Sequence, residues 1–187
     1  MMKTLFLQPP SFDGFDGGAG ARYQARREIR SFWFPTWLAQ PAALVPGSKL
    51  IDAPPARLGM KPVLEAAREH ELCVMHTSSP SFASDVRVAQ KLKEANPNLR
   101  IGMVGAKVAV EPEKSLQQGE PIDFVARNEF DFSVMEVAEG RDLVELGHLC
   151  VGGEARVEPS VRGQIRDFGE TQHNPPFVNR LQNIRGA

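Results

Sequence analysis

The chain has 187 residues, a length that suits one domain. Hydrophobic residues make up 42% and charged residues 24%, which is a globular composition and excludes a wholly disordered chain. Lysine and arginine (22) balance aspartate and glutamate (23), and the formal net charge of −1 argues against a nucleic-acid backbone as the main partner.

The cysteine count and the hydropathy exclude further classes. Cys73 and Cys150 are too few for a disulfide scaffold, a four-cysteine zinc site or the three thiolates that an iron–sulfur cluster with an open iron usually needs. No apolar run approaches the roughly 18–20 residues of a transmembrane segment, and residues 5–7 are too short for a signal-peptide core. We therefore expect a cytoplasmic protein with reduced thiols.

Short apolar runs and amphipathic stretches alternate along the chain. A strand is predicted at residues 3–7, then a long glycine-containing loop at 11–32 and a helix after Pro35. A strand at 48–52, a helix at 60–70, a strand at 72–77 and a helix at 85–95 capped by Ser84 follow. A strand at 99–104, a helix at 111–118, a strand at 122–126 and a helix at 130–138 complete the pattern.

Five strand–helix repeats predict an α/β fold. Continuous apolar strands between amphipathic helices indicate a doubly wound, five-stranded parallel sheet with helices on both faces. The simplest strand order is 2-1-3-4-5, which is Rossmann-like or flavodoxin-like. We expect this domain to cover residues 1–145, and residues 146–187 to form an irregular or partly disordered tail.

Such a sheet binds ligands beyond the carboxyl ends of its strands. Four segments would meet there, residues 8–16, 77–82, 105–108 and 127–131, all rich in glycine, serine, proline or polar residues. The glycine cluster at 14–20 lacks a GxGxxG run, and the chain has no GxxxxGK[ST] motif. A nucleotide or flavin bound on the same fold is therefore kept only as an alternative ligand.

Five sequence segments carry a family resemblance. They are KTLFLQPP at the start, LIDAPP at 50–55, SSPSFASD at 78–85, VGAKV at 104–108 and FVARNEFDF at 124–132. Together they resemble the N-terminal cobalamin-binding domain of cobalamin-dependent radical SAM enzymes, and most closely the hopanoid-biosynthesis-associated radical SAM proteins. The resemblance covers about residues 1–145 and includes the long loop FDGFDGGAGARYQARREIRSFW.

The resemblance implies cobalamin as the cofactor. Ser79 or Ser81 stands where the family's serine contacts the dimethylbenzimidazole tail, and Val104-Gly105 stands where the family has Gly-Gly. No histidine occurs before His70, so the cobalt would not be ligated from the first loop. The residues expected to contact the cofactor are Gln8, Pro9, Thr77, Ser78, Ser79, Ser81, Gly105, Lys107, Val108, Arg127, Asn128 and Glu129.

Several of these residues have a second interpretation. The serines can form a helix-capping turn, Gly105 can be turn chemistry, and Lys107 or the segment 127–129 can simply be solvated. His76 can be a lower axial ligand or a hydrogen-bonded structural histidine. The arginines and aromatic residues of the long loop suggest RNA binding, but the neutral charge favours a loop that packs over the cofactor or against a catalytic domain.

The chemistry of a radical SAM enzyme is missing from the sequence. Neither cysteine begins the CxxxCxxC motif that holds the four-iron cluster used with S-adenosylmethionine. The resemblance therefore implies a binding module without catalysis of its own, whose full-length relative acts on the hopanoid side chain. We expect a truncated or frame-disrupted relative, with a stand-alone module or a degenerate, ligand-free interaction protein as alternatives.

Overall fold

The computed structural model describes residues 1–10, 34–127, 129–146 and 149–152. The predicted loop at 11–32, the candidate residue Asn128 and the predicted tail beyond residue 152 lie outside these described residues.

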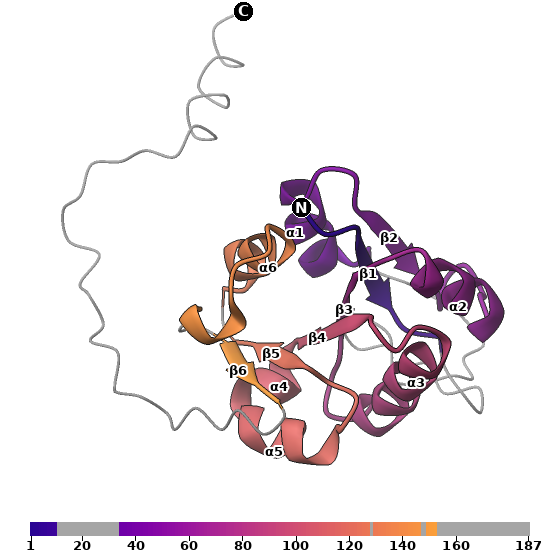
Figure 1. The fold of residues 1–187 in the computed structure, drawn as a ribbon. Helices are drawn as coiled ribbons and strands as arrows, with labels where there is room; N and C mark the ends of the chain where they lie inside the picture. The colour runs from indigo at the N-terminus through magenta and orange to yellow at the C-terminus, as the bar shows by residue number, and fades with distance from the viewer. Residues whose placement is uncertain (11–33, 128, 147–148, 153–187) are drawn as a thin grey trace, which may run out of the picture. The chain divides into compact units, whose positions relative to one another are not determined.

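The described residues form an α/β fold around a mostly parallel sheet (Figure 1). The strand order is β2-β1-β3-β4-β5-β6, in which only the β5–β6 pair is antiparallel among the described strands. The strands are β1 (Thr4–Gln8), β2 (Lys49–Asp52), β3 (Leu72–His76), β4 (Arg100–Val104), β5 (Phe124–Ala126) and β6 (Leu149–Val151). The α/β class and the order of the first five strands agree with the prediction.

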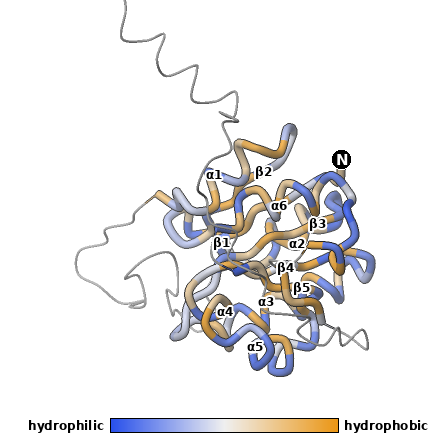
Figure 2. Tube along the Cα trace, turned by 90° about the vertical axis from the view of Figure 1, so that its left-hand side faces the viewer, coloured by the Kyte–Doolittle hydropathy of each residue, from blue (hydrophilic) through white to orange (hydrophobic). Residues whose placement is uncertain are grey.

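Helices cover both faces of the sheet, which explains why the middle residues of its central strands are apolar. On one face α1 (Thr36–Leu44) packs beside α6 (Asp131–Ala138), and their side chains form one core cluster with Phe6, Val74 and Phe124. On the other face α2 (Met60–Arg68) packs beside α3 (Phe82–Ala95) over Leu7, Met75 and Met103. Figure 2 shows the hydrophobic residues concentrated along the central strands.

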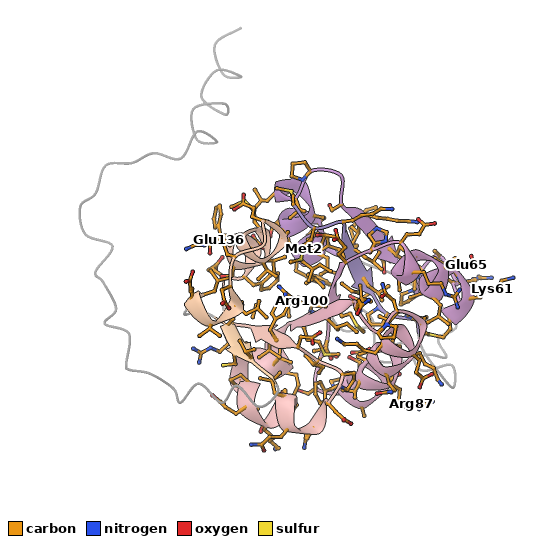
Figure 3. All side chains as sticks on the ribbon, in the orientation of Figure 1. Met2, Lys61, Glu65, Arg87, Arg100 and Glu136 are labelled. Atoms are coloured by element: carbon orange, nitrogen blue, oxygen red, sulfur yellow. The ribbon has the colours of Figure 1, made fainter. Side chains whose placement is uncertain are left out.

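The helices α2 and α3 are amphipathic, as their sequences predict. Val63, Ala66 and Ala67 of α2 are buried, whereas Lys61 and Glu65 point away from the sheet (Figure 3). This separation places the polar side chains in solvent and the apolar ones against the strands.

Three details differ from the sequence-based expectation. The sheet has a sixth strand, β6, within the stretch expected to be irregular, and its register joins Cys150 to Val125. A short helix, α4 (Ala106–Val110), precedes the predicted α5 (Pro112–Gln118), and a 3-10 turn spans Leu143–Glu145. Helix α3 begins at Phe82, so its N-cap is Ser81 and the predicted cap at Ser84 is wrong.

Among the helices of the described residues, none is long and apolar enough to cross a bilayer.

Candidate functional site

The predicted site residues lie along one edge of the sheet, where the parallel strands end. Gln8 is the last residue of β1, Thr77 and Gly105 directly follow β3 and β4, and Arg127 directly follows β5. A backbone hydrogen bond joins the ends of β3 and β4, where the Thr77 N–H donates to the Val104 oxygen at 2.9 Å. The four predicted segments therefore meet at this edge, within the part of the chain that the structure describes.

The same edge has two sides, because alternate residues of a strand face opposite ways. Leu7 and Met75 belong to the core cluster under α2 and α3, so Gln8 and His76, the next residues, face α1 and α6. Thr77 faces the α3 side, where it contacts Asp85. Sequence reasoning assigned Gln8 and Thr77 to one site without distinguishing these sides.

On the α3 side the polar side chains bond to one another. Thr77 Oγ1 donates to Asp85 Oδ2 at 2.7 Å. The Ser78 N–H donates to Ser81 Oγ at 3.0 Å, and the two serine hydroxyls lie 2.8 Å apart. Ser81 is 1% exposed and Thr77 is fully buried, whereas Ser79 is exposed. The serine run thus forms a closed turn at the start of α3, and its side chains make no cap hydrogen bond to the helix.

Asp85 is a buried carboxyl that sequence reasoning did not select. It is 5% exposed in the first turn of α3. Burial raises its pKa from 3.8 to about 7, and the hydrogen bonds from Thr77 and Ser81 partly offset that rise. Near neutral pH, both protonation states of Asp85 are therefore populated.

A pocket of about 330 Å³ opens on the α1/α6 side of the edge. Its walls come from α1, the end of β3, α4, the end of β5 and the start of α6: Trp37, His76, Gly105, Ala106, Ala109, Ala126 and Phe130. The rings of Trp37 and His76 lie 5.1 Å apart at an interplanar angle of 38°. Aromatic walls with small alanines between them suit a flat, mostly apolar group.

Gly105 is the predicted site residue that lines this pocket. Its φ is +122°, a conformation that side-chain-bearing residues rarely adopt. A Cβ added at Gly105 would collide with the backbone oxygen of Thr77 and lie 3.1 Å from His76 Nε2. The backbone therefore requires glycine here with or without a ligand.

The remaining predicted residues do not line the pocket. Lys107 forms an ion pair with Glu111, and its Nζ lies 5.6 Å from the centre of the Phe82 ring. Val108 is buried in the core cluster beneath α3, and Pro9 is buried at the end of β1. Arg127 is half-buried and Glu129 is exposed.

The pocket residues that sequence reasoning missed are Trp37, Ala106, Ala109, Ala126 and Phe130. Trp37 and Phe130 are far apart in the sequence. They line the same pocket because α1 packs against α6. Two of the missed residues, Ala106 and Phe130, lie inside the predicted segments 105–108 and 127–131 but were not selected as site residues, and Ala126 directly precedes the second segment.

The described residues contain no group of three or more histidine, cysteine or acidic side chains able to hold a metal ion. Cys73 is fully buried, and burial raises the pKa of its thiol, which keeps it protonated as a core residue.

Comparisons with known proteins give no relative for this chain: no family model, no curated protein and no solved structure matches it.

Proposed function

We propose that this chain is a cobalamin-binding module, without catalysis of its own, that holds the nucleotide tail of the cofactor at the carboxyl edge of its sheet. The observation that carries the proposal is the aromatic pocket beside Gly105, at the strand ends where the sequence resembles cobalamin-dependent radical SAM enzymes. A parallel sheet of this order binds ligands at that edge.

The size and chemistry of the pocket fit one part of the cofactor. Its 330 Å³ is at the lower end of the roughly 300–1,000 Å³ of small-molecule sites, so it suits a single ring system and not a whole corrin. Trp37 and Phe130 would hold the flat base, while Gly105 and Ala109 would leave room for it. The cobalt chemistry of a bound cobalamin would serve a separate radical SAM domain or subunit, since the chain has two cysteines and no cluster motif.

Two further parts belong to the proposal. We place the protein in the reducing cytoplasm, where its two free cysteines would stay reduced. The serine run, which the family resemblance assigns to the tail, lies on the α3 side of the edge and outside the pocket lining. It would contact a ligand only through groups left over from the bonds between Ser78 and Ser81.

A titration with hydroxocobalamin tests the proposal. Purified protein is mixed with the cofactor at concentrations on the order of tens of micromolar and followed by visible absorbance and gel filtration. Co-elution supports the proposal, and its absence overturns it. A flavin or nucleotide retained from expression would overturn it in favour of the alternative ligand on the same fold.

A matched pair of variants locates the site. Ala109→Leu fills the pocket from α4 and should abolish co-elution, because a leucine side chain occupies space that the base needs. Ala43→Leu makes the same change at an exposed position of α1 and should bind like the wild type. Equal binding by both variants would show that the ligand sits elsewhere.

A further inference from the structure

Polar residues form a row at the carboxyl edge, on the side that faces α1 and α6. The register pairs Gln8 of β1 with Asp52 of β2, and it pairs Leu7 with Met75, so His76 follows beside Gln8. The row therefore runs Asp52, Gln8, His76 across three neighbouring strands. Trp37 of α1 lies over its end, 5.1 Å from the His76 ring. Because His76 also lines the aromatic pocket, the row ends at that pocket.

Two neutral side chains at this edge, Gln8 in the row and Trp37 above its end, each have a hydrogen-bonding group without a partner within the described residues. Gln8 is 1% exposed, yet within the described residues its Oε1 has no hydrogen-bond partner. In the same part of the structure the indole Nε1 of Trp37 is buried and has none either. Buried polar groups are nearly always bonded, because leaving water without a new partner costs free energy. Thr77, on the opposite side of the edge, follows this rule through its bond to Asp85.

We propose that Gln8 and Trp37 form a subsite for a neutral carboxamide group of the ligand. The ligand's amide N–H would donate to Gln8 Oε1, and its carbonyl oxygen would accept from Trp37 Nε1. The inference rests on the proposed function in that it concerns the same pocket.

The same geometry disfavours an acidic group. A carboxylate or phosphate has no proton to donate to Gln8 Oε1, so that oxygen would stay without a partner. It would also bring a negative charge toward Asp52, the neighbour of Gln8 in the row. The subsite therefore selects amides over acids of the same shape.

Benzamide and benzoate test this selection, since they share a ring and differ only in the amide or carboxylate. Binding is measured by ligand-observed NMR at concentrations on the order of millimolar. The wild type should bind benzamide about tenfold more tightly than benzoate, which is the strength of one good hydrogen bond. Equal binding of the two probes, or no binding of benzamide, overturns the inference.

Gln8→Met keeps the shape of the side chain and removes its amide. It should abolish the preference for benzamide without lowering the urea midpoint of unfolding, because the amide oxygen that it removes has no hydrogen-bond partner within the described residues. Trp37→Phe should weaken benzamide binding while keeping an aromatic wall. Gln40→Met, the same exchange at an exposed position of α1, should change neither property. A lower urea midpoint for Gln8→Met would show that its amide serves the fold, through a buried water for example, and would overturn the subsite.

The hydroxocobalamin titration of the same proteins separates the two proposals. If the wild type selects benzamide through Gln8 but does not retain hydroxocobalamin, the amide subsite stands and the cobalamin function fails. If it retains hydroxocobalamin and Gln8→Met changes neither that retention nor the benzamide preference, the function stands and the subsite fails.

Discussion

Thr77 Oγ1 donates a 2.7 Å hydrogen bond to Asp85 Oδ2, and this bond joins the end of β3 to the first turn of α3. The bond supports a carboxyl group that is otherwise removed from water, because Asp85 is 5% exposed. The serines on either side of the turn, Ser78 and Ser81, bond to each other. The polar residues at the end of β3 therefore stabilise the turn into α3 through hydrogen bonds to one another.

Asp85 should make the stability of the protein depend on pH. Its pKa is about 7 in the fold and near 3.8 when unfolded, so folding binds a proton between these values. The free energy of unfolding should fall by a few kcal/mol as the pH rises from about 4 to about 7. Asp85→Asn, which carries no charge at any pH, should lose most of this slope in urea unfolding measured across that range.

Thr77→Val is the complementary variant. It removes the donor that lowers the pKa of Asp85, so the pH at which stability is lost should move upward.

For the Asp85→Asn variant, an unchanged slope of stability against pH would contradict the first prediction. It would mean that Asp85 is more hydrated than its 5% exposure indicates.

Asp123 should matter more to stability than its salt bridge alone suggests. Its carboxylate accepts from Lys93 Nζ at 2.8 and 3.0 Å and from the Ile101 N–H at 2.6 Å. Asp123→Ala should lower the free energy of unfolding by about 1–3 kcal/mol, because it leaves the Ile101 donor without that partner. Lys93→Met should cost about 1 kcal/mol or less, since it removes only a half-exposed ion pair. Equal costs in chemical denaturation would refute this division.

Gly102 and Phe124 should behave as a coupled pair. They are register partners on β4 and β5, and a Cβ added at Gly102 would collide with the Phe124 ring. Gly102→Ala should therefore destabilise by about 1–3 kcal/mol through overpacking. Adding Phe124→Leu should recover part of that loss, with a coupling of about 0.5–3 kcal/mol in a double-mutant cycle. Additive effects would mean that the ring moves aside without cost.

The two thiols should react in a fixed order. Cys73 is fully buried in β3, whereas Cys150 is half-buried in β6 at the edge of the sheet. Burial raises the pKa of both thiols, so each should alkylate more slowly than a free cysteine. Mass spectrometry under native conditions should detect modification at Cys150 first and at Cys73 only on global unfolding. Labelling of Cys150→Ser at the wild-type rate would contradict this order.

The sequence predicted the strands well, because strands covered on both faces are continuous apolar runs such as Leu72–His76. It did not predict β6, because three residues at a half-covered antiparallel edge carry too little pattern. Helix α4 was missed for a similar reason, since five residues after a glycine resemble a loop.

The candidate site was predicted as an edge but not as a pocket. The positions of Gln8 and Gly105 follow from where strands end, which sequence reveals. The partnership of Trp37 with Phe130 depends on how α1 packs against α6, a long-range contact that no local pattern encodes. Nor does local pattern tell that Thr77 turns toward Asp85 while His76 turns toward Trp37.

The reversed direction of β6 determines where the domain can be tethered. Residue Gly152 lies back at the start of β5, where its N–H donates to the Asp123 oxygen at 2.8 Å. Met1 and Met2 precede the start of β1, at the same amino-terminal edge. An affinity tag at Met1, or a reporter inserted after Gly152, would therefore attach at the amino-terminal edge of the sheet, opposite the strand ends that border the pocket. Immobilised on a sensor surface through either point, the protein would present its aromatic pocket to the solution.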